Sequence, residues 1–123
     1  MNIVKFRKSG LFYDAFDDDA KIMHYLFGYR IIDGRASFPS NALNKVLNTL
    51  IDNCVSYEIF LDNELVKEDF KDKNNYMKFL VKASNKLEVA KVMNQIIQKL
   101  DTFSEEQLYD VLNKLSEIVN EKW

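Results

Sequence analysis

The sequence predicts an α+β protein, in which a mixed β-sheet is flanked by helices and followed by a C-terminal helical hairpin. Two patterns indicate this fold class. In the first two thirds of the chain, short runs of β-branched and aromatic residues alternate with helical patterns. In the last third, two amphipathic stripes follow one another with a short break between them. The 123 residues, 47% of them hydrophobic, are enough for a single domain with a core of its own.

The N-terminal part is expected to form a strand and then a helix. Residues 2–7 are rich in strand formers, and Ser9-Gly10 interrupts them. A helix is predicted over 15–27, because apolar residues recur at spacings of four, three and four. These residues are Phe16, Ala20, Met23 and Phe27. The aspartates at 17–19 fall in its first turn, where the helix dipole favours negative charge, and Gly28 is placed to end it.

The middle of the chain contains a predicted hairpin and a second helix. Asp33-Gly34 is a strong turn signal between short strands over 29–32 and 35–38. Pro39-Ser40 then introduces a helix that ends at about Asn53. Its inward face is expected to hold Leu43, Val46, Leu47, Leu50 and Ile51.

Three further segments complete the predicted sheet. Residues 55–61 alternate apolar and polar side chains, which indicates a strand. The highly charged stretch 62–75 is either an exposed connection or an excursion at the sheet edge. Residues 76–81 are assigned as a last strand. The sheet and its two helices would then occupy residues 1–83 of the single domain.

The C-terminal third is predicted to be helical. Residues 85–88 resemble a capping box that opens a helix to about Leu100, and residues 104–107 form a clearer capping box for a helix to about 121. Phe103 and Leu108 would complete a hydrophobic staple. The apolar stripe of the last helix consists of Leu108, Val111, Leu112, Leu115, Ile118 and Val119. We expect this hairpin, over 84–123, to pack on the sheet.

Composition limits the partners and the compartment. Seventeen Lys and Arg against nineteen Asp and Glu give a net charge of −2, whereas a strong nucleic-acid binder is expected to be basic. The only cysteine, Cys54, excludes a disulfide framework and suits a reducing compartment. No basic-then-apolar leader and no membrane-spanning apolar run are present in the sequence. We therefore expect a cytoplasmic protein that does not engage a membrane.

No catalytic set is recognisable in the sequence. His24, the only histidine, is expected to be hydrogen-bonded or exposed rather than a general base, and Cys54 to be a packed thiol. Asp17, Asp18 and Asp19 are adjacent on a predicted helix and point in different directions, which favours a solvated first turn over a metal site. The sequence therefore predicts a non-enzymatic protein with no cofactor and no metal.

The segment from Gly10 to Ala20 suggests contact with nucleic acid. Phe12 and Asp14 follow a glycine at a predicted strand-to-helix turn, behind the cations Arg7 and Lys8. A phenylalanine on a turn flanked by cations can enter a base stack and kink the duplex, while the cations hold the backbone. A nearby carboxylate can accept a hydrogen bond from a base edge. The competing interpretation is that Phe12 and Phe16 are ordinary core residues.

This segment resembles a signature of the MutS DNA mismatch repair family. Residues 10–20 are similar to the Gly-x-Phe-Tyr-Glu-x-Phe-x-x-Asp-Ala motif of its N-terminal mismatch-recognition domain. Residues 36–43 are similar to that domain's Ala-Gly-Val-Pro-Tyr-His-Ala-Leu segment, and residues 47–60 resemble its helix and strand ending in Val-Ala-Ile-Cys-Glu-Gln. The resemblance covers about residues 3–61, half of the chain.

The resemblance implies a mixed sheet flanked by helices and a role in recognising mispaired or bulged DNA. Phe12 would be the wedge beside the unpaired base, and Asp14 would contact that base. Asp is one methylene shorter than the family's Glu, and Ser37 and Asn41 replace its Gly and His. The chain holds none of the family's clamp, lever and ATPase domains. The expected DNA-binding residues are Phe12, Asp14, Arg7, Lys8, Lys5 and Arg35.

Binding to DNA is expected to be weak and salt-sensitive, because few cations offset the cost of unstacking bases. A homodimer or a protein partner could engage residues 85–123, with Trp123 as a candidate anchor. The alternative function is a protein-interaction module that keeps the fold without DNA wedging and acts through its C-terminal helices.

Overall fold

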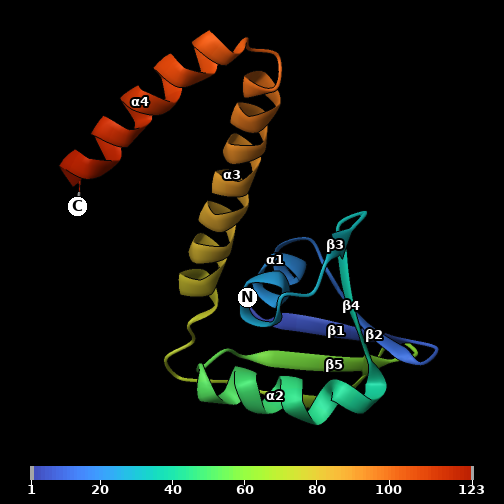
Figure 1. Cartoon of the computed structure of the whole chain (residues 1–123). Coiled ribbons are helices and arrows are strands. Elements are labelled where there is room, and N and C mark those ends of the chain that lie inside the picture. Colours follow the sequence, from blue (N-terminus) through green and yellow to red (C-terminus); the bar gives the residue numbers. More distant parts are fainter. Residues whose placement is uncertain (1, 123) are drawn as a thin grey trace. The chain divides into compact units, whose positions relative to one another are not determined.

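The computed structural model describes residues 2–122, which form a six-stranded mixed sheet and four α-helices (Figure 1). The predicted α+β class, with a mixed sheet, flanking helices and two helices at the C-terminal end, is confirmed. By internal contacts the chain divides after Lys86 into two compact units. Met1 and Trp123, and with Trp123 its expected role as an anchor, lie outside the described residues.

The strands follow the order β3-β4-β2-β1-β5-β6 across the sheet. Their bounds are β1 Val4–Ser9, β2 Phe12–Phe16, β3 Ile31–Ile32, β4 Arg35–Pro39, β5 Tyr57–Leu61 and β6 Glu64–Asp69. β1 and β5 are parallel, and every other neighbouring pair is antiparallel. Parallel neighbours need a long crossover, which in this chain runs from β1 through β2, α1, β4 and α2 to β5.

One face of the sheet carries the core. Strand residues alternate between the two faces, so Val4 and Phe6 of β1 are buried while Lys5 and Arg7 are exposed. Phe38 of β4 lies at the centre of an aromatic cluster, with ring centroids 5.3 Å from Phe6 and 5.6 Å from Tyr13. The first unit therefore has a well-packed aromatic interior.

The helices that follow β2 and β4 both contribute to this core. Helix α1 (Asp17–Phe27) buries Ala20, Ile22 and Met23. It ends as predicted at Gly28, whose φ of 76° lies in the left-handed region and whose N–H donates to the His24 carbonyl. Helix α2 (Leu43–Asp52) follows a short 3₁₀ turn, η1 (Ser40–Ala42), and buries three of its predicted inward residues. These are Val46, Leu47 and Leu50, whereas Leu43 is half-buried and Ile51 is exposed.

The predicted strand-to-helix turn around Phe12 is wrong. Gly10 lies instead in a tight turn between two antiparallel strands, and residues 12–16 form β2. α1 begins at Asp17 rather than at residue 15. The four-residue spacing of Phe12 and Phe16 fits a helix, but it also fits every second position of a strand. Residues 12–16 form a strand because they pair with β1 on one side and with β4 on the other.

For residues 62–88, one prediction is confirmed and two are wrong. The charged stretch contains β6, an edge strand paired antiparallel with β5, so the edge alternative holds. The predicted strand over 76–81 is the start of helix α3 (Tyr76–Leu100). Tyr76, Phe79 and Ala83 are its buried residues, at helical spacings of three and four. Residues 85–88 therefore lie inside a helix and cap nothing.

The last helix, α4 (Glu105–Lys122), begins at the predicted capping box. The Ser104 N–H donates to the Gln107 side-chain oxygen at 3.0 Å, and the Gln107 N–H donates to Ser104 Oγ at 3.3 Å. α4 has no buried residue among those described. No helix within residues 2–122 is long and apolar enough to cross a membrane.

The aromatic cluster predicts a large effect for Phe38→Ala. Phe38 is 1% exposed and its ring contacts three other aromatic rings. Its truncation should lower the free energy of unfolding by about 3–5 kcal/mol, measured by urea denaturation. Phe70→Ala, at a half-exposed position, is the matched control and should cost about 1 kcal/mol or less. Equal losses in the two variants would contradict this core.

Candidate nucleic-acid interface

The face of the sheet opposite the core gathers aromatic and basic side chains. Strand register places Arg7 opposite Asp14 and Phe60, and Asp14 opposite Ser37. Phe16 pairs with Arg35 in the same way. We call this surface the outer face and define it by Lys5, Arg7, Phe12, Asp14, Phe16, Arg35, Ser37 and Phe60. It includes five of the six predicted DNA-binding residues.

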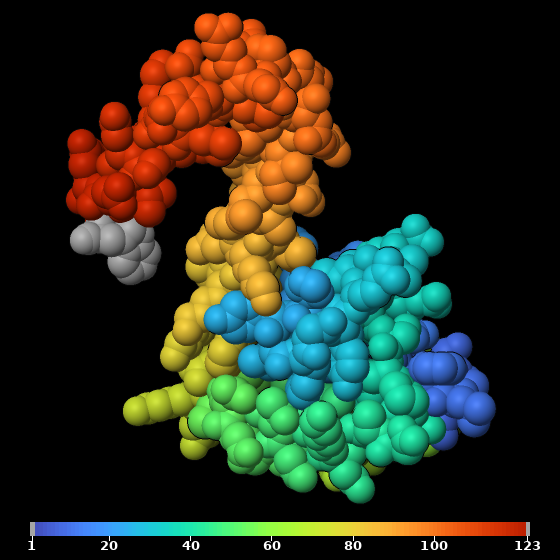
Figure 2. Space-filling view, viewed as in Figure 1, coloured from blue at the N-terminus to red at the C-terminus, as the bar shows by residue number. Residues whose placement is uncertain are grey.

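Phe12 lies at the start of β2, directly after the turn at Gly10 and Leu11. Its side chain is 49% exposed, and Leu11 beside it is 78% exposed. The hairpin tip, dark blue in Figure 2, lies at the molecular surface. Gly10 has a φ of 60°, a conformation that glycine adopts without strain. The tight turn therefore presents the Phe12 ring to solvent instead of to the core.

A shallow cavity of about 360 Å³ adjoins the Phe12 ring. It is lined by Ser9, Phe12, Asp14, Ile32, Arg35 and Ser37. The cavity is thus bounded by an aromatic ring, an exposed isoleucine and a guanidinium group. A flat ring with a donor beside it is the surface on which a nucleobase stacks and hydrogen-bonds.

Asp14 is held by two neighbours on β4. The Ser37 hydroxyl donates to Asp14 Oδ1 at 2.6 Å, and Arg35 Nη1 lies 3.9 Å from Asp14 Oδ2. Asp14 is only 6% exposed, whereas the Arg35 side chain is 52% exposed. This carboxylate is therefore placed to orient Arg35 and Ser37, and little of it is accessible to a base.

The two adjacent cations of β1 lie on opposite faces of the sheet. The Arg7 guanidinium lies 5.0 Å from the Phe60 ring centroid, and its Nη1 donates to Asn63 Oδ1 at 3.2 Å. The Lys8 ammonium lies on the other face, 5.8 Å from the Tyr13 ring centroid. Lys8 therefore does not flank Phe12 together with Arg7, because successive strand residues point in opposite directions.

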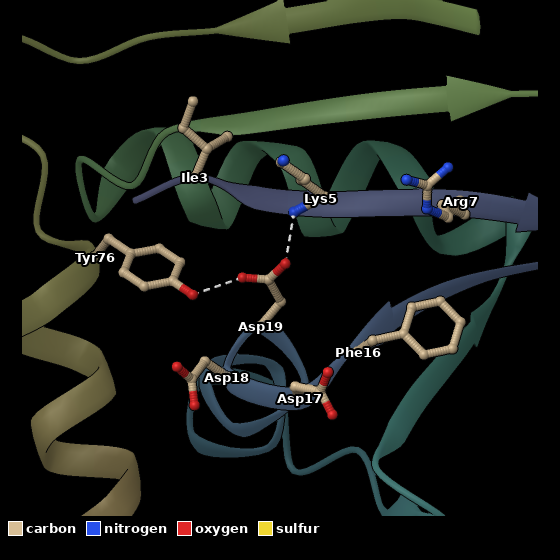
Figure 3. A pocket seen from close by; sticks show the side chains of 8 residues that line it. All are labelled: Ile3, Lys5, Arg7, Phe16, Asp17, Asp18, Asp19 and Tyr76. Atoms are coloured by element: carbon tan, nitrogen blue, oxygen red, sulfur yellow. Dashed lines mark hydrogen bonds between the residues drawn. The ribbon is translucent and has the colours of Figure 1, made fainter. Parts of the chain in front are cut away.

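A second cavity, of about 330 Å³, lies where β1 meets the start of α1 (Figure 3). The Asp19 side chain lies between β1 and the start of α1. Its carboxylate accepts hydrogen bonds from the Lys5 backbone N–H at 3.1 Å and from the Tyr76 hydroxyl at 2.6 Å. Figure 3 shows that Asp17 and Asp18 point away from this pair of bonds. Asp19 thereby joins α1, β1 and the first turn of α3.

Burial controls the titration of this network. Burial raises the pKa of Asp19 above its ordinary value of 3.8, although the hydrogen bonds from Tyr76 and Lys5 partly oppose the change. Burial also raises the pKa of Tyr76, and its bond to the Asp19 carboxylate adds to that effect. Within residues 2–122, no group of three His, Cys, Asp or Glu side chains could hold a metal ion.

The other reactive side chains lie apart from the outer face. His24 Nδ1 lies 2.8 Å from the Tyr29 carbonyl oxygen, which satisfies that ring nitrogen as predicted. Cys54 is exposed rather than packed, at a turn where its φ is 57°. The predicted packed thiol is therefore wrong, because the turn between α2 and β5 leaves Cys54 at the surface.

Three members of the outer face, Phe16, Ser37 and Phe60, were not among the predicted DNA-binding residues. Phe16 was placed on the inner side of a helix, but it is 42% exposed at the end of β2. Period-two alternation from Phe12 would have located it. Phe60 carried no such signal, because its place beside Arg7 depends on the parallel register of β1 and β5.

No known protein family model matches this chain, and no curated protein sequence matches it either.

The Asp19 network predicts a pH dependence of stability. A carboxyl with a raised pKa binds its proton more tightly in the folded state than in the unfolded state. Its contribution is therefore complete below pH 3.8 and is lost as the pH rises through the raised pKa. Asp19→Asn should remove this loss of stability. The urea midpoint of the variant should therefore change less between pH 4 and 7 than that of wild type. Asp17→Asn, on the same turn, should keep the wild-type dependence, and equal slopes in wild type and Asp19→Asn would contradict the assignment.

Proposed function

We propose that this chain is a non-enzymatic DNA-binding domain, similar to the mismatch-recognition module of MutS, that inserts Phe12 at mispaired, bulged or distorted sites. The observation that carries the proposal is the half-exposed Phe12 ring on a tight hairpin turn. An exposed ring with cations nearby can stack between bases while the cations hold the phosphates. The motif resemblance of residues 10–20 supports the same role.

The outer face supplies the polar contacts that the proposal needs. Lys5, Arg7 and Arg35 extend from β1 and β4 on the same side as Phe12. Arg35 lines the cavity beside the ring, so it can contact a phosphate or a base edge next to a stacked base. Asp14 contributes by orienting Arg35, and Lys8 would reach DNA only around the hairpin edge.

The affinity expected from this surface is low. Three cations release few counterions, and unstacking a base step costs a few kcal/mol. Asp17, Asp18 and Asp19 border the second cavity and reduce the local attraction for phosphate. Stacking, rather than net charge, therefore supplies most of the proposed recognition. The free thiol of Cys54 fits a reducing compartment, and we place this activity in the cytoplasm.

A protein-interaction module is the second candidate function. The apolar residues that α3 and α4 leave exposed favour it. In that case Phe12 would have no DNA role, no DNA complex would form at about 50 mM salt, and a pull-down would recover a protein partner. The two candidates are therefore separable by one DNA-binding titration.

Phe12→Ala should weaken DNA binding without unfolding the protein. We expect wild type to bind mismatched or bulged duplexes more tightly than matched duplex, and the variant to lose at least about fivefold of that affinity, since stacking contributes about 1–3 kcal/mol per base. Fluorescence anisotropy at low salt measures the binding. Because the ring is 49% exposed, its loss should cost at most about 1 kcal/mol of stability. Phe70→Ala is the control, and unchanged binding by Phe12→Ala would overturn the wedge.

Salt dependence should report the cations of the outer face. Three phosphate contacts predict a slope of log Kd against log salt concentration of about 3. Lys5→Gln should reduce that slope by about 1, because the Lys5 side chain belongs to the outer face. Lys67→Gln on β6, opposite Ile59 on the core side, is the matched control and should leave the slope unchanged. Equal slopes for the two variants would mean that the DNA phosphates contact residues outside the outer face.

A further inference from the structure

The cavity beside the Phe12 ring combines apolar walls with a group of hydrogen-bond donors. Its volume of about 360 Å³ falls in the range of about 300–1,000 Å³ that is typical of small-ligand sites. Phe12 and Ile32 line it with side chains that are about half exposed. Arg35 lines it from β4, and its side chain is also about half exposed. The cavity therefore offers a flat ring, an aliphatic side chain and several N–H groups to the same ligand.

Asp14 holds the Arg35 side chain at this cavity. Asp14 Oδ2 lies 3.9 Å from Arg35 Nη1, and Oδ1 accepts the Ser37 hydroxyl proton at 2.6 Å. The carboxylate itself is buried, with Arg7 of β1 paired on one side and Ser37 of β4 on the other. A carboxylate in a fixed position restricts the guanidinium more than a second mobile surface side chain would.

This ion pair changes the kind of partner that Arg35 can bind. The charges of Arg35 and Asp14 oppose each other, so the pair attracts a phosphate less than a free arginine would. The guanidinium still carries five N–H donors, and one carboxylate oxygen engages only part of them. Its planar fork can contact two adjacent acceptor atoms together. The remaining donors are therefore better suited to a neutral base edge than to a phosphate.

The two purines differ in the edge that they present to such a fork. Guanine has two acceptors, N7 and O6, on its major-groove edge, whereas adenine has the N7 acceptor beside an N6 amino donor. The adenine amino group would face the donors of Arg35, and it would find little of the Asp14 carboxylate, which is buried. Both purines can stack on a phenylalanine through their π-faces. Hydrogen bonding therefore distinguishes them at this cavity.

We propose that Arg35 reads the base that stacks on Phe12 and selects guanine over adenine through its O6 and N7 atoms. This selectivity rests on the proposed function, because it requires a base to be stacked on the Phe12 ring. Asp14 is the positioning residue, since it holds the guanidinium beside the cavity. The preferred ligand is then DNA in which an unpaired or mispaired guanine is accessible.

Fluorescence anisotropy with duplexes that differ only in one bulged base tests the selectivity. Wild type should bind bulged dG at least about fivefold more tightly than bulged dA, because one bidentate contact discriminates between bases by about that factor or more. Replacing the bulged dG by 7-deaza-dG removes the N7 acceptor alone and should lower the affinity towards that for bulged dA. Equal affinities for bulged dG and bulged dA, or for dG and its 7-deaza form, would overturn the proposal.

Arg35→Lys separates base reading from charge. Lysine keeps the positive charge but has no planar fork, so the ratio of the dG and dA affinities should fall to about 1. Arg7→Lys is the matched control on the outer face, because Arg7 contacts Phe60 and Asn63 and does not line the cavity. It should keep the wild-type ratio. An unchanged ratio in Arg35→Lys would show that Arg35 contacts phosphate only, and base reading would have to be abandoned.

Asp14→Asn tests the positioning role. Asparagine has nearly the same size, and its amide oxygen can still accept the Ser37 hydroxyl proton, but it does not attract the guanidinium as a charge. The ratio of the dG and dA affinities should fall at least about twofold, because charge-assisted contacts are about twice as strong as neutral ones. Circular dichroism checks that the variant is folded. A folded variant with the wild-type ratio would remove the positioning role of Asp14.

Loss of the selectivity and loss of the wedge give different results. Tighter binding of bulged than of matched duplex, with no preference for dG, would leave the wedge at Phe12 and remove base reading by Arg35. Equal binding of bulged and matched duplex by wild type would remove the proposed function, and the selectivity with it.

Discussion

The pairing of β1 with β2 and β5 is the constraint on which the rest of the first unit depends. β1 lies at the centre of the sheet, parallel to β5 and antiparallel to β2. Its alternation puts Val4 and Phe6 into the core and Lys5 and Arg7 on the outer face. A shift of one residue would exchange the two sets and bury the cations. A single strand register therefore sets both the stability of the core and the chemistry of the outer face.

The outer face combines attraction and repulsion for a polyanion. Its cations are few, and the Asp17–Asp19 turn lies at the margin of the same surface. The Asp19 carboxylate accepts hydrogen bonds that hold α1 and the start of α3 to β1. This acidic residue therefore has a structural role. A surface of this kind favours ligands that use stacking and local hydrogen bonds over ligands held by charge alone.

The predictions that held rest on short-range signals. Gly28 ends α1, Asp33-Gly34 turns between β3 and β4, and Ser104 with Gln107 caps α4. Two of the predictions that failed rest on periodicity in short segments, and the capping box expected at 85–88 failed because those residues lie inside α3. Residues 76–81 fit both a strand and a helix, and only the burial of Tyr76 and Phe79 in the first unit shows why the helix forms. Phe12 and Phe16 were ambiguous for the same reason, since positions four apart share a face in both structures.

The sequence by itself determined the fold class, the turn at Asp33-Gly34, the end of α1 and the start of α4, because these follow from hydrophobic patterns and from residues with special backbone conformations. Tertiary structure alone decided which side chains meet. Strand pairing put Lys8 and Arg7 on opposite faces, buried Asp14 between Arg7 of β1 and Ser37 of β4, and brought Phe60 beside Arg7 from more than fifty positions away. The physical reason is that the local conformation of a strand is the same whichever face is buried. Pairing with strands that are distant in the sequence determines which face turns towards the core.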